Sequence, residues 1–322
     1  MSEGAGMRNR GYSQPLEKAI SDFGSEHAFG QVPQKLKEHY GITAPVDMIR
    51  QITERVGEKV KIFLAKLEPI LGSAIRPVIG GMDGCMLPIV ERKIPEKNEK
   101  TEKKAEGKPD YRKQKNVCYK ECRLVLAHEQ GSKTMVFGGT FGEDVEETGK
   151  QLKRCVETVG LNAKNHAHVV GDGAPWIANQ VEEQFGAKGH FLVDIYHVCD
   201  YLSDAADICA PTQKKNWIKE QKELLKKNNY SQVLINLLPY MEPPTVEDAH
   251  APVRACHRYI SNRTHHMDYL GAIKKGLPIG SGEIESAHRY IIQKRLKLAG
   301  AWWKSDNVPN ILALRICQKN NL

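Results

Sequence analysis

The segment VIGGMDGCMLPIV at residues 78–90 is the most apolar stretch of the chain, and we predict a strand over residues 77–90. One charged residue, Asp83, lies in the middle of it. Burying a carboxylate is costly unless it is paired or binds a metal, so Asp83 is a candidate site residue. The stretch is far shorter than the ~20 apolar residues that cross a bilayer, and we expect no association with a membrane.

Outward from this segment, the pattern alternates between strands and helices. We predict strands at 117–127, 134–140, 166–170 and 190–193, with helices at 143–159 and 178–185. From residue 198 to residue 270 the sequence predicts helices only, and two further helices follow at 282–300 and 310–317. This order predicts an α/β fold in which an all-helical insertion precedes the last elements.

The region before the first strand has a helical pattern. Val32–Tyr40 predicts one helix, Gly41 a tight turn, and apolar residues at four-residue spacing from Met48 to Val60 a second helix. Helix, turn and helix is the outline of a helix-turn-helix, although most short helix pairs do not bind DNA.

We therefore divide the chain into five parts. They are a flexible N-terminus (1–26), a helical, helix-turn-helix-like DNA-binding candidate (27–75), the first part of an α/β core (76–200, with a charged loop at 91–116), a helical insertion (201–275) and a C-terminal part of the core (276–322). The charged loop could equally be a solvated, mobile connection.

The charge balance favours a polyanionic partner. Lys and Arg number 47 against 39 Asp and Glu, a formal net charge of +8. The excess is clustered at residues 91–123, 211–230 and 289–322, as binding along a phosphate backbone requires. The eight cysteines form no CxxC pair and the N-terminus has no apolar signal segment, so we expect reduced thiols and a cytoplasmic, nucleoid-associated protein.

Two further carboxylates stand where chemistry could use them. Asp172 directly follows the predicted strand at 166–170, between two glycines. Glu283 and Glu285 begin the helix at 282–300, and two helical positions differ by about 200°, so only one of them can face a site on the strands. Three converging acids suit two-metal phosphoryl transfer, whereas each acid alone could be a cap or a surface partner.

Four blocks of sequence carry a resemblance. They are MDG at 82–84, VVGDGAPWI at 169–177, FLVDIYHV at 191–198 and GSGEIESAHR at 280–289, the last followed by KRLK and two tryptophans. In this order, with a helical stretch between the third and the fourth, they resemble bacterial insertion-sequence DDE transposases of the ISKra type, within the Mutator-like group. The resemblance covers about residues 30–322.

The resemblance implies an RNase H-like catalytic core. Its three acids map onto Asp83, Asp172 and Glu285, rather than Glu283, as the ligands of two Mg²⁺ or Mn²⁺ ions. Asp194 and His197 map onto a block near the active site, and His197 could instead be an oriented hydrogen-bond partner.

The activity that the resemblance implies is DNA transposition. Such an enzyme binds double-stranded DNA as a homo-oligomer, cuts it at the terminal inverted repeats of an element and joins the ends to target DNA. The alternatives are an RNase H-like nuclease without strand transfer and a non-catalytic, transposase-derived DNA-binding protein. The intact acids argue against the second alternative.

Several residues are candidates for contact with DNA. Arg289 follows Glu285 by one helical turn and could reach a phosphate beside the metals. Further candidates are the basic residues and tryptophans nearby, namely Lys294, Arg295, Lys297, Trp176 and Trp302. The basic residues could instead form a solvated helix face, and the tryptophans could pack in the core or at its rim rather than stack on a base.

Overall fold

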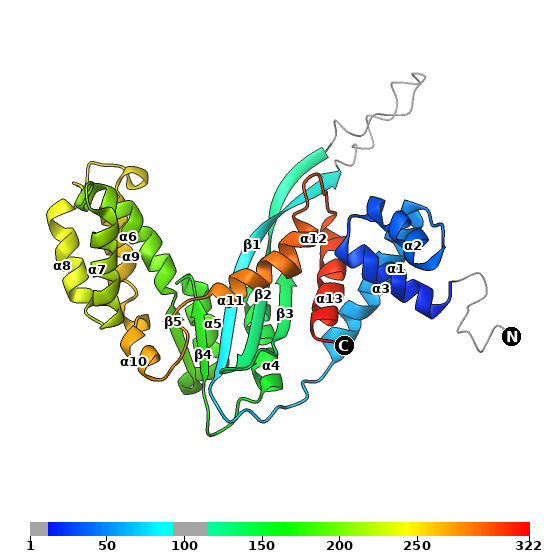
Figure 1. Ribbon diagram of the computed structural model, residues 1–322, viewed down its shortest axis with the longest axis horizontal. Coiled ribbons are helices and arrows are strands. Elements are labelled where there is room, and N and C mark those ends of the chain that lie inside the picture. Colours follow the sequence, from blue (N-terminus) through cyan, green and yellow to red (C-terminus); the bar gives the residue numbers. More distant parts are fainter. Residues whose placement is uncertain (1–11, 93–114) are drawn as a thin grey trace, which may run out of the picture.

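The computed structural model describes residues 12–92 and 115–322, and it has a mixed α/β architecture around one five-stranded sheet. A bundle of helices lies at one end of the sheet and the N-terminal helices lie at the other (Figure 1). The predicted charged loop at 91–116 falls almost wholly outside the described residues. No helix among the described residues has the length and apolar character needed to cross a membrane.

The sheet has the order β3-β2-β1-β4-β5. Its strands are β1 (Val78–Arg92), β2 (Lys115–Glu129), β3 (Val136–Phe141), β4 (Ala167–Gly171) and β5 (Gly189–Val193). The first three pair antiparallel, whereas β4 runs parallel to both β1 and β5. All five strands were predicted from the sequence at nearly these positions.

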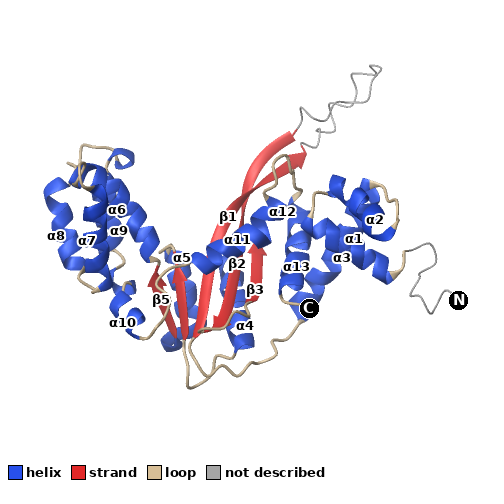
Figure 2. Ribbon diagram, in the orientation of Figure 1, coloured by secondary structure: helices blue, strands red, loops and turns tan. Residues whose placement is uncertain are grey.

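The two long strands extend beyond the rest of the sheet. β3 pairs with β2 only from Cys122 to Ala127, and β4 pairs with β1 only up to Gly81. The remaining ends of β1 and β2 pair with no other strand of the sheet and project as a two-stranded arm (Figure 2), on which Ile89 forms an isolated bridge with Trp303. We call these ends, residues 86–92 and 115–121, the β1–β2 arm.

The strands bury side chains on both faces, with a period of two. On β2, Cys122, Leu124 and Leu126 pack with helices α11 (Gly282–His288) and α13 (Val308–Lys319). The alternate residues Val125 and Ala127 pack with α4 (Val145–Val159) and α5 (Pro175–Phe185) on the other face. A sheet covered on both faces needs apolar residues at successive positions, as the sequence of β2 provides.

The helical insertion follows β5 and carries its own apolar core. Its helices are α6 (Ile195–Cys209), α7 (Lys214–Lys226), α8 (Tyr230–Leu237), α9 (Pro252–Ser261) and α10 (Tyr269–Lys274). Residues 201–275 contain only helices and turns, as predicted. The same core reaches Val170 and Val193 in the sheet, so the insertion is packed against the ends of β4 and β5.

The described part of the N-terminal region, from residue 12 onward, contains the α-helices α1 (Gln14–Glu26), α2 (Val32–Tyr40) and α3 (Val46–Lys66). The expectation of a flexible N-terminus through residue 26 is wrong from Gln14 onward, because α1 buries Ile20 against α2 and α3. The turn at Gly41 has φ +68°, as predicted for a glycine connector. A role of α2 and α3 in binding DNA stays a prediction.

The predicted helix at 282–300 is shorter and less regular than expected. After α11 comes one π-helical turn, Arg289–Gln293, and then α12 (Lys294–Leu296). The buried guanidinium of Arg315 on α13 donates to the carbonyl oxygens of Tyr290 and Ile291. These hydrogen bonds from the neighbouring helix satisfy carbonyl groups of the wider π-helical turn and so stabilise it.

Candidate active site

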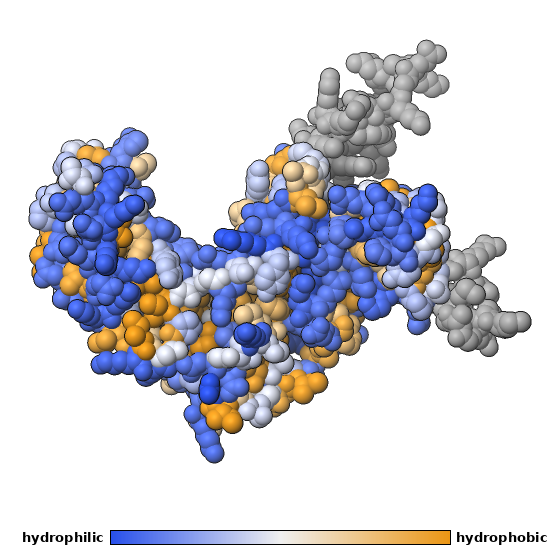
Figure 3. Space-filling view, viewed as in Figure 1, coloured by the Kyte–Doolittle hydropathy of each residue, from blue (hydrophilic) through white to orange (hydrophobic). Residues whose placement is uncertain are grey.

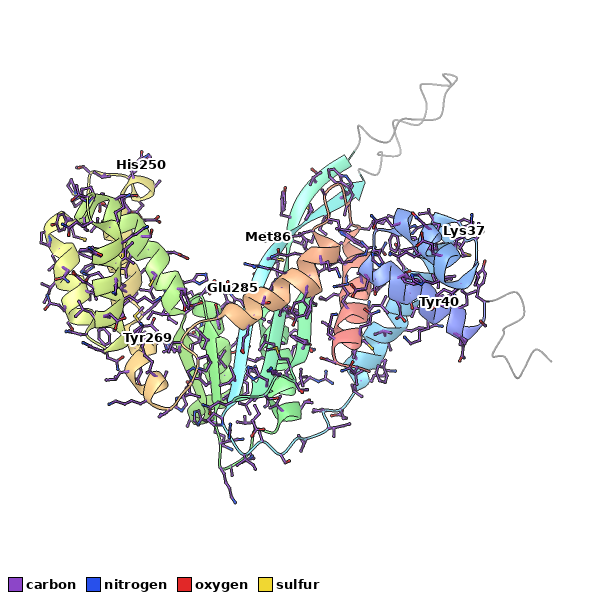
Figure 4. All side chains as sticks on the ribbon, viewed as in Figure 1. Lys37, Tyr40, Met86, His250, Tyr269 and Glu285 are labelled. Carbon is purple, nitrogen blue, oxygen red and sulfur yellow. The ribbon has the colours of Figure 1, made fainter. Side chains whose placement is uncertain are left out.

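A pocket of about 570 Å³ opens where β1, the end of β4 and the first turns of α6 and α11 meet. It lies near the floor of a concave face between the helical insertion and the β1–β2 arm, where Figure 4 labels Glu285 (Figures 3 and 4). The ionisable side chains that line it are Asp83, Asp172, Tyr196, His197, Asp200 and Glu285. The structure therefore gathers the three acids that the sequence analysis selected.

Asp83 lies on the face of β1 that α11 covers. Gly81, two residues earlier on the same face, leaves room for Ile284, since a Cβ at Gly81 would stand 3.1 Å from the Ile284 Cβ. The Oδ1 atom of Asp83 accepts a hydrogen bond of 2.7 Å from the Gly84 N–H. The absence of a side chain at Gly81 thus brings the helix that carries Glu285 close to the strand.

The electrostatics around Asp83 disfavour its negative charge. Burial raises the pKa of Asp83, the nearby Asp172 and Glu285 raise it further, and His288 opposes them. The Nε2 atom of His288 lies 2.9 Å from the Asp83 carbonyl oxygen and 3.7 Å from its Oδ2. A bound cation would relieve this repulsion among the acids, so the pocket suits a positive ligand.

Asp172 stands beside Asp83 because of the strand register. Gly81 of β1 pairs with Val170 of β4, and the two strands run parallel, so Asp172 comes level with Asp83 two residues further on. The Oδ1 atom of Asp172 accepts a hydrogen bond of 2.9 Å from the Ala174 N–H, which fixes the carboxylate at the strand end. The prediction of neighbouring strands is confirmed, since β1 and β4 are adjacent in the sheet, but Asp172 lies one residue beyond the end of β4.

Asp194 lies beneath the pocket and is fully buried. Its Oδ1 accepts from the Tyr196 N–H, and its Oδ2 accepts from the N–H of Ser281 at 2.9 Å and from its hydroxyl at 2.5 Å. Burial alone would raise the pKa of Asp194, but its interactions with His197, Ser281 and Tyr196 outweigh it and lower the pKa. Asp194 therefore caps α6 and holds the start of α11.

His197 and Glu285 meet above Asp194. The His197 Nδ1 lies 3.5 Å from the Asp194 Oδ2, and this contact raises the pKa of His197 to about 8. Ser281 Oγ lies 3.1 Å from Glu285 Oε1. Within the described residues, Asp194, His197 and Glu285 are the group whose ligand atoms all lie within 4.8 Å of one another, so they could hold a metal ion.

The metal ligands predicted from the sequence are only partly the same residues as the group of Asp194, His197 and Glu285. Glu285 belongs to both sets, whereas Asp83 and Asp172 line the same pocket outside the 4.8 Å group. Their role as metal ligands stays a prediction.

Glu283 and Glu285 point in different directions from α11, as expected for two residues about 200° apart around a helix. Its Oε2 lies 2.8 Å from Nε2 of His128 on β2, and it does not line the pocket. Burial would lower the pKa of His128, but the hydrogen bond to Glu283 helps to raise it overall, and the same bond lowers the pKa of Glu283. Glu283 thus anchors α11 to the sheet while Glu285 faces the acids.

The prediction that Arg295 contacts DNA is wrong. Its side chain is buried, with the residue only 2% exposed, and its Nε donates to the Gly24 carbonyl oxygen at 3.0 Å. The guanidinium lies over the rings of Phe29 and Trp303, at 4.6 and 4.7 Å from their centroids. Burial lowers the pKa of Arg295 to about 10. Arg295 therefore joins the N-terminal helices to the segment that follows α11.

The other predicted DNA contacts are exposed to different degrees. Arg289 and Lys297 are exposed, and Lys294 is exposed but forms an ion pair of 3.2 Å with Glu26. Trp302 is 55% exposed. Contact of these residues with DNA stays a prediction.

Trp176 is half-buried and packs against the apolar cluster under α4 and α5. The guanidinium carbon of Arg123 lies 5.3 Å from the centroid of its ring. These contacts favour the packing alternative for Trp176 over stacking on a base.

Several side chains at the site had no role assigned from the sequence. Among them, Tyr196 and Asp200 line the pocket. Ser281 and His288 belong to the block around Glu285, four residues before it and three after it, a spacing that helical geometry could have flagged. Tyr259 and Arg263 of the helical insertion contact the Asp172 loop from 87 and 90 residues away. Nothing in a single sequence connects positions so far apart.

Comparison with known proteins adds no family assignment: no protein-family model matches this chain, and no curated protein matches it significantly.

Proposed function

We propose that this chain is a DDE transposase of an insertion sequence, which cuts DNA at the element ends and joins them to target DNA. The observation that carries the proposal is the convergence of Asp83, Asp172 and Glu285 in one pocket. These acids come from a strand, a strand end and a helix that are far apart in the sequence. Each acid alone could be a helix cap or a surface ion-pair partner. Together they form the acidic pocket that phosphoryl transfer with divalent ions needs.

The sheet supports an RNase H-like core for this protein. Such a core requires the first two acids on neighbouring strands, and β1 and β4 are neighbours. The third acid must come from a helix that returns to the same edge after the insertion, as α11 does.

The donor set fits Mg²⁺ or Mn²⁺. Asp83, Asp172 and Glu285 would hold two such ions, because carboxylate oxygens are the ligands that hard divalent cations prefer. Burial raises the pKa of Asp83, and repulsion from Asp172 and Glu285 adds to it, which is a second sign that the pocket favours a positive ligand. When bound, the ions supply Lewis-acid stabilisation of the attacking and leaving oxygens of a phosphodiester.

The chain's own residues would orient the DNA around the acids. His197, with a pKa of about 8, carries positive charge near neutral pH and lies at the pocket wall, where it can attract a phosphate oxygen. Arg289 and Lys297 continue the basic surface along the segment after α11. Asp194 and Ser281 hold α11 in place and leave Glu285 aimed at the acids.

The partner would be double-stranded DNA, first the terminal inverted repeats and then the target, bound by a homo-oligomer at the nucleoid. The concave face that holds the pocket is largely hydrophilic in the view of Figure 3. A wide hydrophilic concavity is a suitable shape for a duplex.

The test is cleavage of a plasmid that carries the inverted repeats flanking this coding region. We expect the purified chain to nick the repeat ends with Mg²⁺ and to lose this activity in EDTA. Asp172→Asn should remove nicking without weakening a gel shift of the same DNA. A wild-type chain that binds the repeats but never nicks them would support a non-catalytic DNA-binding protein instead.

A further inference from the structure

The helical insertion grips the loop that carries Asp172. The Oη atom of Tyr259 on α9 donates a hydrogen bond of 2.5 Å to the Asp172 carbonyl oxygen. One residue further along the loop, the Nε of Arg263 donates to the Gly173 carbonyl oxygen at 2.8 Å. Two consecutive carbonyl groups at the end of β4 thus depend on side chains from outside the sheet.

The loop is shaped to receive these two side chains. Gly173 has φ +80°, a left-handed conformation that glycine adopts without strain. A Cβ at this position would stand 2.6 Å from the Tyr259 Oη and 2.9 Å from the Arg263 Nε. The conformation and the close approach together require glycine, and they place the loop backbone directly against α9.

The two gripping side chains are themselves held in place. The Tyr259 ring stacks on Tyr201 of α6 at 4.1 Å between centroids, with 21° between the ring planes. The guanidinium carbon of Arg263 lies 4.1 Å from the centroid of the Tyr259 ring, and Nη1 of Arg263 donates to the Tyr259 carbonyl oxygen. Tyr259 is 7% exposed. The contact is therefore a preorganised one, built on the core of the insertion.

We propose that Tyr259 and Arg263 are positioning residues that fix the Asp172 carboxylate in the geometry of the metal site. The carboxylate is tied to the same short loop by its bond from the Ala174 N–H, so a shift of the loop carbonyl groups moves the carboxylate with them. The helical insertion thereby takes part in building the acidic pocket. The consequence for DNA cleavage rests on the proposed function, whereas the consequence for metal binding requires only that Asp172 is a metal ligand.

The test measures Mn²⁺ binding and DNA cleavage separately. Tyr259→Phe removes one hydrogen bond and keeps the stacked ring, and Arg263→Lys keeps the charge but loses the Nε donor. We expect Mn²⁺ affinity, measured from the free-ion paramagnetic resonance signal, to fall two- to tenfold in each, as the loss of one hydrogen bond implies. Tyr240→Phe, an exposed tyrosine of the same insertion, is the matched control and should leave the affinity unchanged.

A kinetic readout separates positioning from general damage to the fold. We expect kcat for nicking to fall, KM for DNA to stay constant and excess Mn²⁺ to restore part of the rate, while the thermal midpoint of Tyr259→Phe stays near that of the wild type. Unchanged Mn²⁺ affinity in both variants, alongside a clear loss in Asp172→Asn, would overturn the proposal. If the wild type binds Mn²⁺ but does not cut DNA, and Tyr259→Phe binds Mn²⁺ more weakly, the proposed function is refuted. The positioning role of Tyr259 is then retained.

Discussion

Substituting Glu285 and Glu283 one at a time by glutamine distinguishes a residue of the pocket from a residue that only anchors the helix α11. Glu285 faces Asp83 and Asp172 in the pocket, whereas Glu283 bonds His128 on the sheet. Glu285→Gln keeps the shape of the side chain and removes one negative charge. Under the proposed function, ligation of the ions would supply several kcal/mol of transition-state stabilisation, so we expect Mg²⁺-dependent nicking to fall by about 100-fold or more.

The matched variant Glu283→Gln should leave nicking within about twofold of the wild type. It replaces a charge-assisted hydrogen bond by a neutral one at a side chain that is 48% exposed, so the loss of stability should be below about 1 kcal/mol. Binding of DNA should stay intact in both variants, and it should tighten slightly in Glu285→Gln, since a negative charge near a phosphate is removed.

The assay combines initial rates of nicking on a labelled repeat end with gel-shift titrations at one salt concentration. Loss of nicking in Glu283→Gln but not in Glu285→Gln would show that the wrong glutamate was chosen as the third acid. Full activity in both variants would mean that neither is needed, and Asp194 would become the first alternative.

Three further predictions concern stability, salt and pH. Arg315→Met should destabilise the fold by about 3–5 kcal/mol in denaturant titrations, since the carbonyl groups of Ser25, Tyr290 and Ile291 lose their buried donor, while Glu26 keeps its ion pair with Lys294; a loss below about 1 kcal/mol would contradict this. Replacing Arg289 and Lys297 together by alanine should reduce the slope of log affinity against log salt by about 1.8, and an unchanged slope would remove this surface from the DNA path. Because the pKa of His128 is raised in the folded state, its contribution to stability is fully present below pH 6.5 and is lost as pH rises through the folded pKa. Because the pKa of Glu283 is lowered, its contribution is present above pH 4.5 and is lost as pH falls through the folded pKa. The stability gap between wild type and Glu283→Gln should therefore be widest between about pH 4.5 and 6.5, and a gap that does not change with pH would refute the pairing.

The acids could be predicted from the sequence because their local context is unusual. Asp83 interrupts an apolar strand, and Asp172 follows a strand between glycines, so each stands out without knowledge of the fold. The choice of Glu285 over Glu283 needed only helix geometry and a resemblance.

The partners of these acids could not be predicted in the same way. Arg295 looks like its exposed basic neighbours in the sequence, and only the packing of Phe29 and Trp303 on both sides makes it a buried residue. The grip of Tyr259 on the Asp172 loop likewise depends on how the insertion folds back on the sheet. The helix α1 was missed because its stability comes from burying Ile20 against α2 and α3.

The most direct measurement of the central claim is strand transfer with a pre-cut, 3′-labelled inverted-repeat duplex, supercoiled target DNA and Mg²⁺. If the pocket formed by Asp83, Asp172 and Glu285 is the active site of a transposase, the wild type will join the labelled end covalently to the target, and Asp83→Asn will not. Hydrolysis of the ends without any joined product would identify a nuclease. Joining that persists in Asp83→Asn would contradict the assignment of this pocket.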